Sequence, residues 1–247
     1  DNSEGATITA EGTQIKIVYK SELAPKYQYI FNCMIEGATG IDAILAQIRG
    51  EEFEGKTTTV YLPIGYYRNG KCYTTAPAQY NGKTAAVNGT EAKTQGYILT
   101  TINYSLDENM VYFADCEDME IVGETVNGFS WGTFNRVSQG KHIRLNVGTS
   151  MTTKDAIATA GTYDIALYGR SDSGTSSPVT IYIVASDGTE TKVEAAASPE
   201  TYASAGMGWF TFAGVTIPAG AKLKFVNETS GNGFGYDCLK VTKPAAE

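Results

Sequence analysis

The second half of the chain repeats one rhythm, in which a short alternating or β-branched stretch is followed by a turn signal. No convincing helix interrupts it. The predicted strands are 111–116, 141–147, 161–169, 179–185, 191–194, 208–212, 222–227 and 236–242. Short strands at regular spacing are typical of a β-sandwich or jelly roll, so we expect that architecture for residues 110–247.

The first half predicts a different unit. Strands are expected at 13–20, 27–35, 57–62 and 95–104, and a hairpin at 66–75 around Asn69-Gly70. Its one helix candidate is 41–49, because four apolar residues there recur at helical spacing and Gly50 could cap its end; they are Ile41, Ile44, Leu45 and Ile48. We therefore expect residues 1–106 to form a small α+β, grasp-like domain with one helix, and the whole chain to be mainly β.

Three acids suggest a metal site. Asp115 and Glu117 share one face of the predicted strand 111–116 if its alternation continues, and Asp237 opens the last strand. If the first and last strands of this half are neighbours, the three carboxylates converge. A hard cation with oxygen ligands, most simply Ca²⁺, would satisfy them together with backbone carbonyls of the turn 138–140. The alternatives are a solvated acidic strand, or neutralisation by Arg136 or Lys141.

Composition narrows the class of partner. A formal net charge of −8 argues against nucleic acid and against docking on an anionic membrane, and no stretch approaches a membrane span. The four cysteines have no CxxC spacing, which makes zinc unlikely by pattern. The sequence favours four buried free thiols. A Cys116–Cys238 or a Cys33–Cys72 disulfide remains an alternative.

No complete catalytic site can be assembled from the sequence. The single histidine, His142, lies within a predicted strand and has no supporting nucleophile motif. No glycine-rich phosphate loop joins a strand to a helix. Asp115 and Glu117, two residues apart beside a third acid, suit a cation more than an acid/base pair. We therefore expect a protein that is not an enzyme.

Several motifs, in this order, resemble the family 6 and family 35 carbohydrate-binding modules, which are galactose-binding-like β-sandwiches. The resemblance covers about residues 111–244 and not the first hundred. It rests on the acid-rich segment 113–119 and on Gly-Lys-His-Ile-Arg-Leu, Ala-Gly-Thr-Tyr-Asp-Ile, Trp-Phe-Thr-Phe, Ile-Pro-Ala-Gly and Tyr-Asp-Cys-Leu-Lys-Val, at 140–145, 160–165, 209–212, 217–220 and 236–241. It implies a structural calcium ion at Asp115, Glu117 and Asp237, with Asp115 standing where Glu is commoner.

The same resemblance implies a sugar-binding cleft at the loop ends. The tryptophan matching Trp209 stacks on a sugar in such modules, and a closing-loop Asn bonds it; Gly235 stands where that Asn often does, with Asn232 displaced. Trp131, in the glycine-punctuated loop 127–135, and Tyr202 are further candidate platforms, since flat aromatic faces suit pyranose rings. The expected ligand-binding residues are Trp209, Trp131, Tyr202, Asn135 and Asn232. Each of these aromatic residues could instead fill the core or a domain interface.

Two functional hypotheses follow. The first is a non-catalytic carbohydrate-binding protein, extracellular or on a bacterial surface, whose partner is a glycan or polysaccharide and which is covalently linked to further domains of a glycan-degrading protein. The second is a structural or adhesive module that binds a protein partner, with calcium purely structural. Neither involves nucleic acid or membrane insertion. Exposure of Trp131 and Trp209 in one groove would favour the carbohydrate-binding hypothesis. Burial of both residues would favour the structural or adhesive module.

Overall fold

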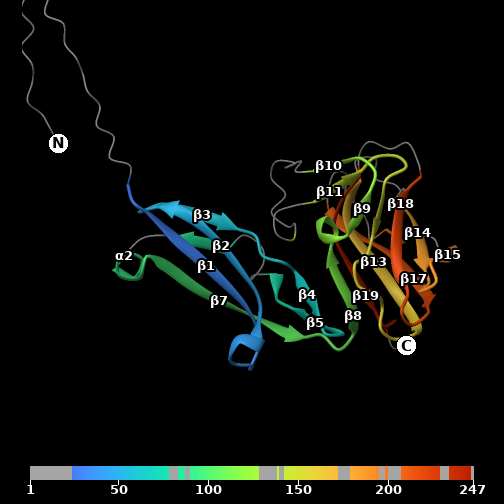
Figure 1. Ribbon diagram of the computed structural model, residues 1–247, viewed down its shortest axis with the longest axis horizontal. Helices are drawn as coiled ribbons and strands as arrows, with labels where there is room; N and C mark the ends of the chain where they lie inside the picture. The colour runs from blue at the N-terminus through green and yellow to red at the C-terminus, as the bar shows by residue number, and fades with distance from the viewer. Residues whose placement is uncertain are drawn as a thin grey trace, which may run out of the picture.

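The computed structural model describes residues 24–77, 83–86, 90–127, 138, 142–171, 179–194, 198–199, 207–228 and 234–245. It is made almost wholly of strands, arranged as an elongated sheet on the N-terminal side and a two-layered sandwich on the C-terminal side (Figure 1). The expectation of a mainly β chain ending in a β-sandwich is confirmed. The predicted strand 13–20 lies outside the described residues.

The N-terminal sheet has the strand order β2-β1-β7-β5-β4. In that order the strands are Ile44–Phe53, Lys26–Ile35, Tyr97–Leu106, Lys71–Thr74 and Gly65–Arg68. A separate pair, β3 (Thr57–Val60) and β6 (Lys83–Ala86), contributes to the same small core, whose buried residues are Phe31, Cys33, Val60, Leu62, Ala85, Ile102 and Tyr104. β1 pairs antiparallel with β2 and parallel with β7, so the sheet is mixed.

The helix expected at 41–49 is wrong. Ile41–Ala43 forms a single 3₁₀ turn, η1, and the chain continues as strand β2. Gly50 does not cap a helix but lies in that strand opposite Tyr29, whose ring crosses the space that a Cβ would take. A short helix, α2 (Thr90–Gln95), precedes β7 instead.

The predicted hairpin around Asn69-Gly70 is confirmed as β4 and β5. Both central residues have positive φ, 52° for Asn69 and 74° for Gly70, as a type I′ turn requires. The hairpin at Asp187-Gly188 is likewise present. It joins β14 (Val179–Val184) to β15 (Glu190–Lys192), and Asp187 Oδ1 accepts a hydrogen bond from the Thr189 amide at 2.9 Å.

One layer of the sandwich has the order β10-β11-β19-β13-β17-β16, with β8 also paired to β19. Their bounds are Thr125–Asn127, Ile143–Leu145, Phe234–Thr242, Gly161–Ser171, Met207–Ile217, Ser198–Pro199 and, for β8, Met110–Asp115. The other layer has the order β15-β14-β18-β12-β9, where β18 is Lys222–Asn227, β12 is Ser150–Thr152 and β9 is Glu120–Val122.

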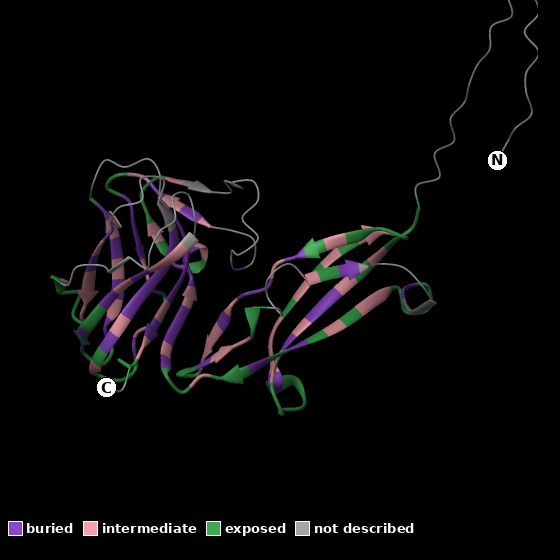
Figure 2. Ribbon diagram, turned by 180° about the vertical axis from the view of Figure 1, so that it is seen from behind, coloured by how far each residue is buried: buried purple, intermediate pink, exposed green. Residues whose placement is uncertain are grey.

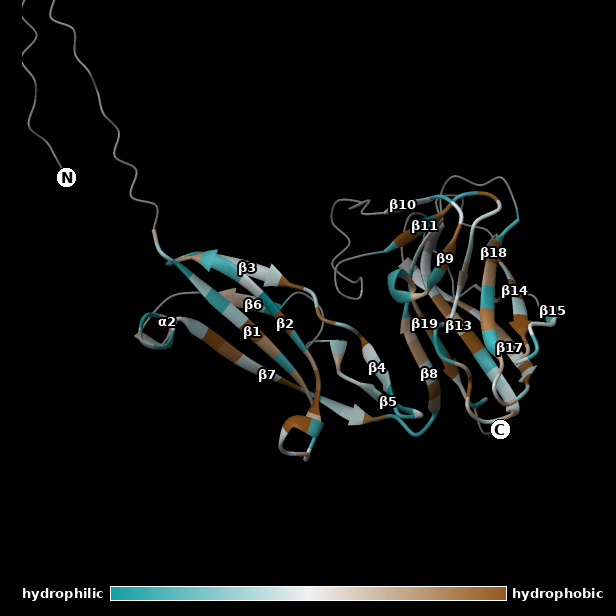
Figure 3. Ribbon diagram, viewed as in Figure 1, coloured by the Kyte–Doolittle hydropathy of each residue, from teal (hydrophilic) through white to brown (hydrophobic). Residues whose placement is uncertain are grey.

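The sandwich core lies between these two layers. The buried residues of this core recur along the strands of both layers, which also carry half-buried and exposed residues (Figure 2). β18 shows the underlying pattern most clearly, because the buried Leu223 and Phe225 alternate with the half-buried Lys222 and Lys224 (Figure 3). Period-two alternation thus places one face of each strand in the core.

The β4–β5 hairpin joins the N-terminal sheet to the sandwich by packing on β8. A third buried cluster spans this junction and contains Cys72, Met110, Phe113, Tyr168 and Cys238. The Ile64 amide donates to Ser138 Oγ at 3.1 Å, and the Asp107 amide donates to the Cys72 carbonyl at 2.9 Å. None of the helices in the described part of the chain is long and apolar enough to cross a membrane.

Candidate functional site

The first and last strands of the sandwich are neighbours, as the acid cluster requires. β8 and β19 pair antiparallel, and Asp115 lies directly opposite Cys238. Asp237 is therefore one residue along β19 from the partner of Asp115. This adjacency confirms the part of the prediction that concerns strand order.

The expected alternation beyond Asp115 is wrong. The strand ends there, and Cys116–Asp118 forms a 3₁₀ turn, η2, in which the Met119 amide donates to the Cys116 carbonyl at 3.3 Å. Glu117 is therefore presented by a turn and not by the strand face of Asp115. Cys116 packs in the sandwich core, whereas Cys238 belongs to the junction cluster on the other side of the sheet. All four cysteines are buried and free.

The acids of this region are shielded from water. Asp115 is 6% exposed and Asp237 is fully buried. Oδ1 of Asp115 and both carboxylate oxygens of Glu117 are also inaccessible. Asp237 Oδ2 accepts a hydrogen bond from the Ser138 amide at 2.8 Å, whereas its Oδ1 is buried and has no hydrogen-bond partner among the described residues.

Burial raises the pKa of Asp237 well above its ordinary value. The hydrogen bond from Ser138 opposes that rise, and the negative charges of Asp115 and Glu117 add to it. A buried carboxylate in this setting needs either a proton or a cation. The donor set is all oxygen, which fits a hard cation such as Ca²⁺.

The described side chains do not by themselves form a compact group of three or more His, Cys, Asp and Glu ligands. Convergence of all three acids on one point thus stays a prediction. A cation here would need further oxygens, and the turn expected to supply them is described only at Ser138. Arg136 and Lys141, the alternative neutralising residues, lie outside the described residues.

Trp209 lies near the start of β17 and is partly buried. Its ring centroid is 5.0 Å from that of Tyr168, on the neighbouring strand β13, with an angle of 48° between the planes. The Lys240 ammonium, from β19, lies 4.1 Å from the Trp209 ring centroid. Three adjacent strands therefore place two aromatic rings and a cation together on the outer face of the sheet.

The other predicted ligand-binding residues, Trp131, Tyr202, Asn135 and Asn232, lie outside the described residues. The exposure of Trp131 and Trp209 in one groove thus remains untested. Phe210 and Phe212, which follow Trp209, are both buried.

Sequence reasoning missed Tyr168 and Lys240 as neighbours of Trp209. Nothing in the local sequence indicates them, because the contact depends on the registers of three strands: Tyr168 pairs with Trp209 on one side and with Cys238 on the other. Their alternation does place them outward, next to the buried Leu167 and Leu239.

Gly235 has a structural reason for replacing the expected asparagine. A Cβ built on it would lie 2.8 Å from Cδ2 of the His142 ring. The His142 ring occupies the space that a side chain at position 235 would need. A ligand contact from position 235 is therefore not available.

Comparisons with known proteins give likeness of fold only. No protein-family model matches the sequence, and no curated protein matches it. Similar solved structures include a β-(1,4)-mannanase carrying a family 35 module from Podospora anserina, at 17% identity and a TM-score of 0.39. They also include a family 35 carbohydrate-binding module from Clostridium thermocellum, at 14% and 0.39, and a carbohydrate-binding module (CBM6cm-2) from Cellvibrio mixtus lichenase 5A, at 14% and 0.34.

The covered regions explain these matches. The match to the mannanase covers 57% of this chain and 29% of that protein. The match to the Clostridium thermocellum module covers 54% of this chain and 98% of the module, and the match to CBM6cm-2 covers 55% and 99%. This chain thus spans less than a third of the mannanase and nearly the whole of each isolated module. Because the TM-scores are below 0.5, the β-sandwich assignment stands on the strand order described above.

Proposed function

We propose that this chain binds carbohydrate without catalysing its conversion. The observation that carries the proposal is the group formed by Tyr168, Trp209 and Lys240 on the outer face of the sandwich. A partly exposed indole offers a flat surface to the C–H face of a pyranose, and a neighbouring ammonium can donate hydrogen bonds to its hydroxyls. The sequence resemblance to family 6 and family 35 modules supports the same role for Trp209.

Calcium is the proposed structural ion. Asp115, Glu117 and Asp237 would hold it, and it would supply the positive charge that their buried oxygens call for. Bound there, it would tie the end of β8 and the turn η2 to the start of β19. Its proposed role is in stability and not in contact with the sugar.

The proposed setting is extracellular or on a bacterial cell surface. The chain would act as an accessory unit, covalently joined to further domains of a glycan-degrading protein. Its partner would be a glycan or polysaccharide. The formal net charge of −8 favours a neutral or basic glycan over a polyuronate.

Affinity electrophoresis in gels containing single soluble polysaccharides tests this function. We expect at least one plant or mucin-type glycan to retard the wild-type protein, and Trp209→Ala to migrate as in the glycan-free gel. Val147→Ala is a suitable control because Val147 is an exposed apolar residue of the sandwich. If no glycan retards the wild type, or if Trp209→Ala is retarded equally, the proposal is wrong.

A structural or adhesive module is the second candidate, and one observation favours it. Lys240 already lies over the Trp209 ring, and Trp209 packs against the junction cluster that includes Cys72 of the β4–β5 hairpin. An indole engaged in this way can serve packing alone. On this alternative Trp209→Ala would lower the melting temperature and no glycan would bind.

A further inference from the structure

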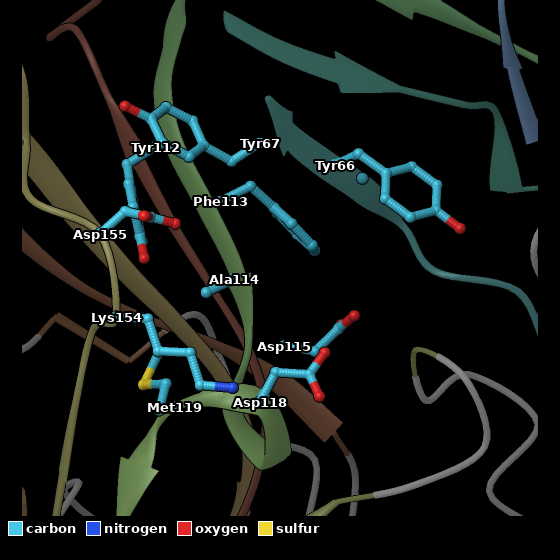
Figure 4. A pocket seen from close by; sticks show the side chains of 11 residues that line it. Tyr66, Tyr67, Tyr112, Phe113, Ala114, Asp115, Asp118, Met119, Lys154 and Asp155 are labelled. Atoms are coloured by element: carbon cyan, nitrogen blue, oxygen red, sulfur yellow. The ribbon is translucent and has the colours of Figure 1, made fainter. Parts of the chain in front are cut away.

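A small cleft lies where the β4–β5 hairpin meets the sandwich. It has a volume of about 190 Å³ and is walled by β4 on one side and by β8, η2 and the residues after β12 on the other (Figure 4). The N-terminal half contributes Gly65, Tyr66 and Tyr67 to it. This cleft therefore exists only because the two halves of the chain pack together.

Aromatic rings form one wall of the cleft. The rings of Tyr67 and Tyr112 lie 4.8 Å apart at 48°, and Phe113 follows on the same strand as Tyr112. Tyr112 is fixed in place: it is 2% exposed, and its hydroxyl has hydrogen bonds with the Thr153 side chain and the Asp155 backbone. The wall is thus preformed, which lowers the entropic cost of binding.

Charged groups line the opposite part. Asp155 lies beside Tyr112, while Lys154 and Asp118 lie together at the other end of the cleft (Figure 4). In the described part of the chain, neither Asp118 nor Asp155 forms an ion pair. The exposed carboxylates of Asp118 and Asp155 outweigh the single lysine at the mouth, and the buried Asp115, a proposed calcium ligand, also lines the cleft, so the mouth favours a cation.

Tyr67 adds a neutral hydroxyl beside this charge. Burial raises the pKa of Tyr67 above its ordinary value, and the negative charge of Asp155 adds to the rise, so its hydroxyl is neutral near pH 7. The face of a tyrosine attracts both sugar C–H groups and an ammonium, and its hydroxyl can exchange hydrogen bonds with a polyol.

We propose that this cleft binds one amino sugar residue with a free amine, its ammonium near Asp155 and its ring against Tyr67. The volume is below the 300–1,000 Å³ usual for ligand pockets, which limits the occupant to about one ring. The pairing of aromatic wall and carboxylates selects a cationic sugar over a neutral one. This inference rests on the proposed carbohydrate binding but places it away from Trp209.

Titration with glucosamine, followed by amide chemical shifts in ¹H–¹⁵N NMR spectra, tests the assignment. We expect saturable shifts around Tyr67 and Asp155. Glucose, N-acetylglucosamine and ethanolamine should bind at least about tenfold more weakly, because each lacks either the charge or the ring. Asp155→Asn should weaken glucosamine about tenfold to a hundredfold, since it removes one charge and keeps the shape.

The shifts around Tyr67 and Asp155 report on this site and not on the face proposed for Trp209. Glu190→Gln, on the far sheet at β15, is the control and should leave these shifts and the glucosamine affinity unchanged. Three outcomes overturn the inference: no saturable shift, equal binding of ethanolamine, or loss of glucosamine binding in Trp209→Ala with retention in Asp155→Asn. Failure of the polysaccharide gels with success here would instead reject the Trp209 face alone.

Discussion

Asp237 is the residue on which the proposed metal site depends most. It is fully buried on a central strand, with one carboxylate oxygen bonded to the Ser138 amide. Desolvating a charged carboxylate is costly unless a proton or a counter-ion offsets it. A cation bound at Asp237 would offset this cost.

Asp237→Asn tests this explanation. Calcium at about a hundred times its Kd should stabilise the wild type by about 2.7 kcal/mol, and the variant by much less. Without calcium the variant should be no less stable, because the buried charge is gone. Calorimetry in calcium and in a chelator measures the stability of each protein with and without the ion. Equal calcium stabilisation in both proteins would contradict the assignment, and Glu120→Gln serves as the control.

The four cysteines give a prediction about reactivity. Burial raises the pKa of every one of these thiols, that of Cys72 to about 12 with a further contribution from Asp107. Because the thiolate is the nucleophile, and at pH 8 its fraction at Cys72 is on the order of 10⁻⁴, the native protein should not react with a thiol reagent. Four thiols should react after unfolding. A count of two would indicate a disulfide.

Prediction at the level of residues succeeded for the acids, whose residue type alone points to a possible cation site. Asp115 and Asp237 could be placed on neighbouring strands from sequence, because they belong to the strands that open and close the sandwich, at the end of β8 and within β19. The neighbours of Trp209 could not be predicted from sequence, because the contact with Lys240 depends on the pairing registers of β17, β13 and β19. Glu117 was misplaced because the turn η2 replaces the expected strand.

At the scale of elements, β2 shows how pairing overrides a helical pattern. The residues predicted as helix have apolar side chains at helical spacing, but Ala46 and Ile48 also alternate and pair with Cys33 and Phe31 of β1. Antiparallel pairing along β1 satisfies the backbone of this segment and partly buries Leu45, Ala46 and Ile48 against the small core. Local propensity is a weak prior against such tertiary contacts.

Gly169 makes a second element-scale prediction. It lies in β13 at an irregular register with β19, and a Cβ there would come within 2.6 Å of the Gly235 carbonyl oxygen. Gly169→Ala should therefore destabilise the protein by about 1–3 kcal/mol, because backbone has to move. Gly50→Ala is the matched control. Its Cβ would meet the hydroxyl and ring of Tyr29, a half-buried side chain that can turn aside where backbone cannot, so its effect on urea denaturation should be smaller than that of Gly169→Ala.

Across the whole molecule, the junction between the two halves depends on Phe113. This residue is 4% exposed and packs in the cluster shared by the β4–β5 hairpin and the sandwich. Phe113→Ala should cost about 3 kcal/mol in the free energy of unfolding. Denaturation followed by fluorescence and by circular dichroism measures the loss. A change below about 1 kcal/mol would show that the halves do not depend on this contact.

The sandwich could be predicted from sequence more fully than the N-terminal sheet. Its strands follow one another with recognisable turns such as Asp187-Gly188, so local signals specify them. The N-terminal sheet instead contains the parallel pair β1–β7, whose strands lie more than sixty residues apart in the sequence. No local signal fixes such a pairing.

The central claim is that a glycan binds at the Trp209 face while calcium serves only stability. Its most direct measurement is isothermal titration of the glycan that retards the protein most, with calcium and with chelator, for the wild type and Trp209→Ala. We expect binding of the wild type to persist in chelator at a temperature where the protein stays folded, and to be lost in the variant. Binding by folded Trp209→Ala with wild-type affinity would contradict the claim.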